Sequence, residues 1–126
     1  MSFSNYLETK VLGHVFGATA YTAPATLYLA LFTSNPAEDG SGTEVSGGGY
    51  ERQEVAFTVT GNTASNTLAV EYATASASYG TVTHVGVYDA STSGNLMAYA
   101  ALTSSKSIDT GDVFRVPAGD LDITLD

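Results

Sequence analysis

The sequence predicts a mainly β protein, a β-sandwich or jelly-roll-like domain with one N-terminal α-helix. Short apolar runs of about four to eight residues recur between clusters of Gly, Asn, Asp, Ser and Pro, which is typical of strands joined by turns. Only the N-terminal segment carries a helical period. The 126 residues are enough for a single domain, 1–126, with its own hydrophobic core.

The predicted helix covers residues 5–18. Its apolar side chains recur near every 3.6 residues, at Leu7, Val11, Val15 and Ala18. Asn5 and Glu8 resemble a capping box, and Ser4 is an alternative N-cap. Gly17 is the predicted end of the helix. Because so short a helix is marginal in isolation, we expect its apolar face to dock somewhere, on this chain or on another.

Strand candidates follow the helix along the chain. They cover 26–32, 52–60, 67–72, 81–88, 96–102, 106–108, 113–116 and 121–125. In the last of these, Leu121, Ile123 and Leu125 alternate with polar residues and are expected to face inward. The polar, Gly-rich segment 33–49 is predicted to be a long loop, of the kind that is often mobile or used for contacts.

The predicted strand pair within 81–102 carries more apolar surface than one sheet face needs. Its second strand, 96–102, is apolar at odd and even positions alike, and strand 26–32 has the same property. Successive strand side chains point to opposite faces, so both faces need cover. A single short helix is too small for this, and we therefore expect a neighbouring subunit. The candidate assembly interface is Leu96, Met97, Tyr99, Leu102, Tyr28 and Phe32.

The charge of the chain restricts its partners. Thirteen acidic residues face only Lys10, Arg52, Lys106 and Arg115, for a net charge of −9. Direct nucleic-acid binding and attraction to an anionic membrane are both unexpected, because both depend on clustered Lys and Arg. The chain has no cysteine, no apolar run of membrane-spanning length and no signal-peptide pattern at its start. We expect a soluble protein that is made in the cytoplasm.

No motif in the sequence specifies catalysis or a cofactor. His84 could pair with Asp89 or Asp112, but no G-x-S-x-G nucleophile motif accompanies it. The acidic residues near the C-terminus lack the EF-hand spacing of a Ca²⁺ site. The glycine run 47–49 precedes a strand and no lysine, unlike a phosphate-binding loop. The eight tyrosines fit a core or an interface better than a sugar platform. We therefore predict no enzyme, no metal site and no cofactor.

Several motifs together resemble a family of small virion proteins of tailed bacteriophages. They are SNYLETKVLGHVFG, YTAPATLYLALFTSNP, GTEVSGGGYERQ, GTVTHVGVYDASTSGNLM and ALTSSKSIDTGD. Members are often labelled tail fibre or minor tail proteins, and some proteins of this type are similar to capsid cement proteins, β-sandwich modules on the outer shell. The resemblance implies a structural role and brings no catalytic or cofactor residue.

Three functional hypotheses follow. The first and favoured one is a capsid cement (decoration) protein on the outer capsid surface, a homo-oligomer whose partner is the major capsid protein. The second is a tail-associated protein, such as a fibre adaptor or receptor-binding module, with tail proteins as partners. The third, an enzyme acting on cell-surface polymers, has the least support because no catalytic motif accompanies it.

Overall fold

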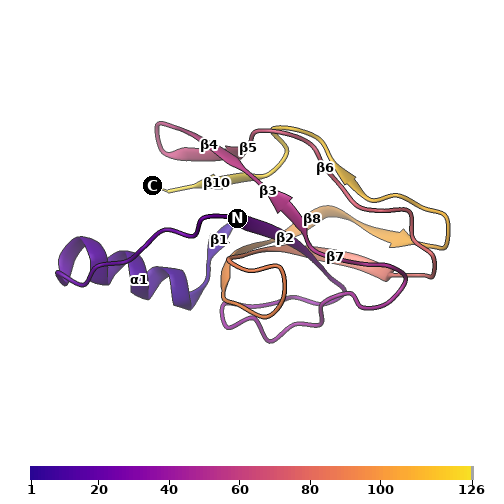
Figure 1. The fold of residues 1–126 in the computed structure, drawn as a ribbon, viewed down its shortest axis with the longest axis horizontal. Coiled ribbons are helices and arrows are strands. Elements are labelled where there is room, and N and C mark those ends of the chain that lie inside the picture. The colour runs from indigo at the N-terminus through magenta and orange to yellow at the C-terminus, as the bar shows by residue number, and fades with distance from the viewer. Residues whose placement is uncertain (126) are drawn as a thin grey trace.

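The chain forms two layers of antiparallel strands, with a helix at one end (Figure 1). The structure is a computed structural model that describes residues 1–125. Its elements are β1 (Ser2–Phe3), α1 (Asn5–Phe16), β2 (Leu27–Phe32), β3 (Gln53–Val55), β4 (Phe57–Thr60), β5 (Thr63–Asn66), β6 (Val70–Glu71), β7 (Gly80–Tyr88), β8 (Leu96–Ile108), β9 (Arg115–Val116) and β10 (Asp122–Thr124). The predicted class, a mainly β sandwich with an N-terminal helix, is confirmed.

The first layer is a five-stranded antiparallel sheet in the order β1-β8-β7-β2-β3. In its centre Leu29 of β2 lies opposite Val87 of β7, and Leu31 lies opposite Val85. These four side chains, each at most 2% exposed, belong to the main core between the layers. The residues between them point to the outer face of the sheet and are also covered, so the central strands are buried on both faces.

The chain changes layers at Ala56, between β3 and β4. The sequence predicts one strand over 52–60, but β3 pairs with β2 in the first sheet whereas β4 pairs with β5 in a second, three-stranded sheet, β10-β5-β4. Strands that leave one sheet for the other make the corners of many sandwiches. The hydrophobic pattern continues through the corner, which is why the sequence alone does not reveal the break.

Other strand boundaries also differ from the prediction. β5 was not predicted, and the expected strand 67–72 is reduced to β6, which pairs with β9. The candidates 96–102 and 106–108 are a single strand, β8, which stays paired with β7 across an irregularity in register between Val82 and His84. In the last strand Leu121 is buried as predicted, but Leu125 is 54% exposed because it lies beyond the end of the core.

Asn66 joins the parts of the second layer. Its buried side-chain amide donates to the carbonyls of Leu68 and Pro117, at 2.9 and 3.0 Å, and its oxygen accepts the backbone N–H of Leu121 at 2.9 Å. A buried amide costs stability unless it is paired, and here both donors and the acceptor have partners. Asn66 therefore fixes the end of β5 to the segment before β10.

Tyr72 connects the two layers through the core. Its hydroxyl donates to the backbone carbonyl of Leu29 in β2 at 2.5 Å. Its ring stacks on Tyr50 and meets Phe114 edge-on, with ring centres 5.9 and 5.8 Å apart. Tyrosine suits this position because its ring fills apolar space while its hydroxyl reaches a buried acceptor. The predicted role of the tyrosines in the core is confirmed for Tyr72.

The helix α1 begins after Ser4, the alternative N-cap of the sequence. The Ser4 side chain accepts the backbone N–H of Leu7 at 3.2 Å, and its hydroxyl donates to the carbonyl of Leu96, which fastens the helix start to β8. The helix ends at Phe16, and Gly17 is its C-cap. The predicted range of 5–18 is thus correct at its start and two residues too long at its end.

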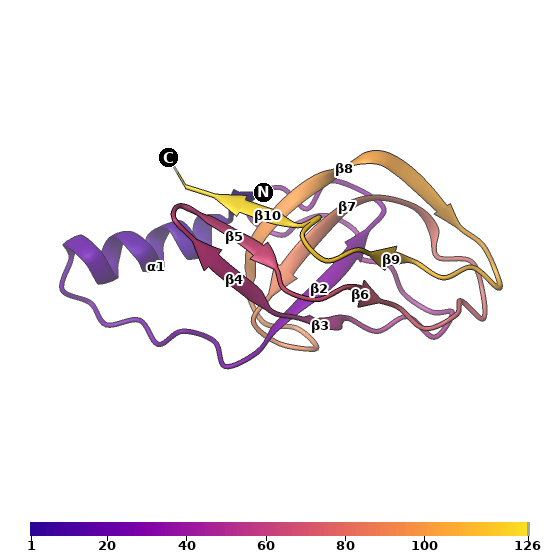
Figure 2. The ribbon, with the colours of Figure 1, turned by 90° about the horizontal axis from the view of Figure 1, so that it is seen from above.

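The apolar face of α1 docks only through its first turn. Tyr6 and Leu7 pack against the main core, but none of the twelve residues of this helix is buried. Figures 1 and 2 show the rest of the helix projecting beyond the end of the sandwich. This chain therefore covers only the start of the apolar face, and docking of the remainder stays a prediction.

Candidate functional site

The six residues of the predicted assembly interface lie in two environments. Three of them, Phe32, Leu96 and Met97, are at most 6% exposed, and three are half-buried, Tyr28, Tyr99 and Leu102. Met97 belongs to the main core. Phe32 and Leu96 form a second, smaller core on the outer face of the first sheet, with Ala30 and Tyr88. Contact of the six with another subunit stays a prediction, for which the three buried residues offer little surface.

The long loop 33–49 covers this second core. Its two ends are held close together, because the N–H of Thr33 donates to Thr43 and the N–H of Val45 donates to Leu31, both at 2.9 Å. Pro36 is less than 2% exposed, and the backbone at Gly40 lies against Leu96. The expectation that one helix is the only cover within the chain is therefore wrong. The polar composition of the loop gives no sign of this cover, because the loop approaches the second core with its backbone at Gly40 rather than with large apolar side chains.

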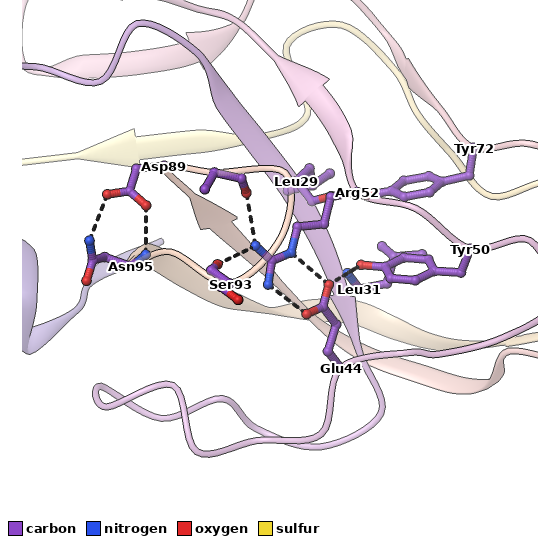
Figure 3. A network of polar contacts seen from close by, with 10 residues as sticks. Leu29, Leu31, Glu44, Tyr50, Arg52, Tyr72, Asp89, Ser93 and Asn95 are labelled. Carbon is purple, nitrogen blue, oxygen red and sulfur yellow. Dashed lines mark hydrogen bonds and ion pairs between the residues drawn. The ribbon is translucent and has the colours of Figure 1, made fainter.

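Arg52 fastens this loop to the hairpin loop between β7 and β8 (Figure 3). Its guanidinium makes a two-point ion pair with Glu44, with Nε–Oε2 and Nη2–Oε1 distances of 2.9 and 2.8 Å. Its Nη1 donates to the carbonyls of Ala90 and Ser93 at 2.9 and 2.7 Å. The Cζ atom also lies 3.7 Å from the ring centre of Tyr88. These five residues are named the Arg52 clasp.

The guanidinium of the clasp is committed to the protein itself. The Arg52 side chain is only 7% exposed, and four of the five N–H donors of an arginine are engaged here. Two-point pairs between arginine and a carboxylate combine charge with fixed geometry. The clasp therefore sets the relative position of two surface loops and leaves little of Arg52 for a ligand.

Tyr50 extends the clasp into the main core. Its hydroxyl donates to Glu44 Oε2 at 2.7 Å and accepts the backbone N–H of Leu31 at 3.0 Å. Burial raises the pKa of Tyr50, and the hydrogen bond to the Glu44 carboxylate raises it further. Burial alone lowers the pKa of Arg52, but the hydrogen bonds and charge of Glu44 outweigh this and the net pKa is raised. Both shifts favour a neutral Tyr50 and a charged Arg52 at neutral pH.

The hairpin loop has a second brace of its own. The Asp89 carboxylate accepts the backbone N–H of Asn95 at 2.7 Å and its side-chain amide at 2.9 Å (Figure 3). Gly94 has a φ of 75°, and a Cβ there would lie 2.6 Å from Asp89 Oδ1, so the turn depends on glycine. With the clasp on one side and Asp89 on the other, the loop is held in one shape.

The two braced loops border an open cleft. Ser91, Thr92 and Ser93 line one side, and Ser46 and Gly47 line the other. These residues offer hydroxyl and backbone groups at exposed positions. Of the charged residues that line the cleft, Arg52 and Glu44 pair with each other, whereas Glu51 is exposed. The cleft is therefore suited to polar contacts with another macromolecule. No local pattern marks Arg52 or Glu44 as partners; the one usable signal is an arginine just before a strand in a chain with only four Lys and Arg residues.

The residues considered for catalysis are not brought together. His84 Nδ1 lies 2.8 Å from Thr83 Oγ1, within hydrogen-bond distance of its neighbour in β7. Asp112 instead accepts the backbone N–H of Asp109 at 2.8 Å in the turn after β8. Asp89 is the brace of the hairpin loop. The structure thus gives each of these side chains a local partner.

Residues 1–125, which the structure describes, were considered as a source of metal ligands and of membrane-spanning helices. Residues 1–125 contain no group of three or more His, Asp or Glu side chains placed to hold a metal ion. The second histidine, His14, accepts the backbone N–H of Tyr21 at 3.1 Å and so ties the segment after α1 back to the helix. Within the same residues, the one helix is too short to cross a membrane.

The fold and the braced loops define a class, a mainly β sandwich with an N-terminal helix and two surface loops held by side-chain contacts. The sequence matches, over residues 2–124, the family described as Podophage GP4 fiber I protein gp80. The chain belongs to this family of structural proteins of tailed-phage virions. The resemblance to small tailed-phage virion proteins is confirmed. A comparison with curated proteins found no match.

Proposed function

We propose that this protein is a fibre component of a podophage tail, a structural module that contacts other virion or cell-surface macromolecules. The observation that carries the proposal is the match to a phage fibre protein over residues 2–124. The sequence alone favoured a capsid cement protein and held the tail protein as the alternative. The family description reverses that order of preference.

The geometry supports an interfacial role. The Arg52 clasp and the Asp89 brace hold two loops in fixed positions before any partner arrives. A pre-ordered loop loses less conformational entropy on binding, so more of the contact energy remains as affinity. The exposed hydroxyls of Ser91 and Thr92 are the groups this surface presents. Absence of enzymatic activity remains a prediction that accompanies this role.

Location and copy number in purified virions test the proposal. A fibre component is expected at roughly six to twelve copies per particle, or a small multiple, because tail symmetry sets the number. Cryo-electron microscopy should place its density on the tail. Hundreds of copies spread over the shell would contradict the fibre proposal and support the cement role.

A further inference from the structure

The outer half of α1 exposes large apolar side chains. Leu12, Val15 and Phe16 are 59%, 61% and 81% exposed. Their spacing of three and four residues places them on one face of the helix, where they form a continuous ridge. Leu125, 54% exposed, lies at the same end of the molecule, beside the helix. Exposed apolar patches of this kind commonly mark contact sites.

A groove runs beside this ridge. It is lined by Phe3, Val11, Leu12 and Leu125, and by the acidic side chains of Glu8 and Glu38. Figures 1 and 2 show α1 projecting next to the C-terminal strand, with the helix and the small sheet reaching beyond the main body. Leu12 belongs to both surfaces, since it lies in the ridge and also lines the groove.

We propose that a second copy of this chain covers this surface, with the two α1 helices antiparallel about a two-fold axis near Leu12. A two-fold contact requires one patch to fit its own copy. Ridge and groove on the same helix meet that requirement, because the ridge of each copy enters the groove of the other. The residue common to both surfaces then lies closest to the axis.

The low net charge of the helix permits a second copy to bind here. The chain as a whole carries −9, so most faces of two copies repel each other. The helix itself carries one acidic and one basic side chain, Glu8 and Lys10, and is neutral when His14 is neutral. An antiparallel pair sets opposite ends of the two helix dipoles side by side, which is favourable. Glu8 and Glu38 of each groove then face the negative end of the partner helix, and this repulsion keeps the dimer weak.

The available area fits a weak dimer. Taking about 200 Å² for a buried phenylalanine and about 100 Å² for each aliphatic side chain, the exposed fractions give on the order of 700 Å² of apolar surface for two copies. Interfaces are roughly 60% apolar, so the total is about 1,100 Å². This is just below the range of about 1,200–2,000 Å² for stable specific interfaces. We expect a dissociation constant of about 10–100 µM.

Sedimentation equilibrium of the full chain over a range of concentrations tests the inference, which is independent of where the protein lies in the virion. We expect a monomer–dimer equilibrium that Phe16→Glu weakens by at least about tenfold, because two like charges then enter the contact. Leu68→Glu is the matched control, since it adds the same charge at a position 72% exposed between β5 and β6 and should leave the equilibrium unchanged. Val15→Glu, at a second position of the ridge, should also weaken the dimer. Circular dichroism checks that each variant is folded.

Three outcomes would overturn the inference. One is a wild-type chain that stays monomeric up to about 1 mM, well above the expected dissociation constant. Another is a trimer or higher species, which a two-fold contact does not produce. The last is equal weakening by Phe16→Glu and Leu68→Glu. A monomer that binds a different virion protein through Phe16 would assign the surface to that protein instead.

Discussion

Two apolar surfaces outside the main core differ in whether the chain covers them. The second core around Phe32 and Leu96 is covered by the chain's own loop 33–49 and held by the Arg52 clasp. The ridge on α1 around Phe16 has no such cover within the described residues. The loop costs conformational entropy to order, and the clasp offsets that cost with charge-assisted hydrogen bonds. The comparison indicates that the covered surface stabilises the fold and that the open one is available for assembly.

The same substitution in the two surfaces should separate these roles most strongly. Phe32→Ala is expected to lower the free energy of unfolding by about 3–5 kcal/mol, because it leaves a cavity in the second core. Phe16→Ala is expected to change it by less than about 0.5 kcal/mol at a concentration where the chain is monomeric. Urea denaturation measures both values. Similar losses from the two variants would show that the outer half of α1 is part of the stable fold.

The clasp can be tested with the two arginines of the chain. Arg52→Ala is expected to cost about 2–4 kcal/mol, somewhat less than a fully buried pair, because Glu44 is 26% exposed and can recover part of its hydration. Arg115→Ala, at an exposed position in β9, is the matched control and should cost less than about 0.5 kcal/mol. Thermal unfolding monitored by circular dichroism compares them. Equal shifts would remove the clasp as a special source of stability.

Tyr50, the buried tyrosine that hydrogen-bonds to Glu44 of the clasp, predicts sensitivity to alkali. Burial raises the pKa of Tyr50 above its ordinary value of 10.0, so the folded protein keeps a proton that the unfolded chain loses. The free energy of unfolding should therefore fall above about pH 10, by up to about 1.4 kcal/mol per pH unit for each such group. Tyr50→Phe should make this decline less steep in urea titrations from pH 9 to pH 11. An unchanged slope would show that Tyr50 does not contribute.

Two glycines should respond to alanine with opposite signs. A Cβ at Gly86 would lie 2.8 Å from Leu96 Cδ1 and 3.0 Å from the Phe32 ring, so Gly86→Ala should destabilise by about 1–2 kcal/mol through overpacking. A Cβ at Gly13 in α1 meets only Thr19 at 3.7 Å, and Gly13→Ala should stabilise by about 0.5–1 kcal/mol. Unfolding curves of both variants test this contrast. A stabilising Gly86→Ala would mean that the second core is loosely packed.

The sequence predicts the elements that have a regular spacing of apolar residues. It does not predict which segments pack against each other in the folded chain. The helix, its start near Ser4, most strands and the two-faced strand 26–32 follow from local patterns, and the structure agrees with them. The corner at Ala56 does not, because the alternation of side chains continues across it. The same limitation concealed the clasp. Arg52 and Glu44 are eight residues apart, and their carbonyl partners come from a loop about forty residues away, at Ala90 and Ser93.

The error about cover has a physical cause. A sequence pattern shows that both faces of a strand are apolar, but it does not show which segment packs on them. Segment 33–49 is rich in Ser, Gly, Asp and Glu, yet its backbone at Gly40 lies against Leu96 and Tyr88, and its Pro36 is fully buried. The helix has the apolar residues needed to cover a sheet, but it points away from the strands and projects beyond the end of the sandwich (Figure 2). Composition therefore favoured the wrong segment.

Cross-linking of single-cysteine variants tests the central contrast most directly, because the natural chain contains no cysteine. A disulfide forms only when two Cα atoms come within about 7 Å. Under mild oxidation at a concentration near the dissociation constant, Leu12→Cys on α1 should give a covalent dimer, since Leu12 lies near the proposed two-fold axis. Thr92→Cys, on the braced hairpin loop, should stay monomeric. A dimer from Thr92→Cys with none from Leu12→Cys would contradict the account and assign self-association to the braced loops.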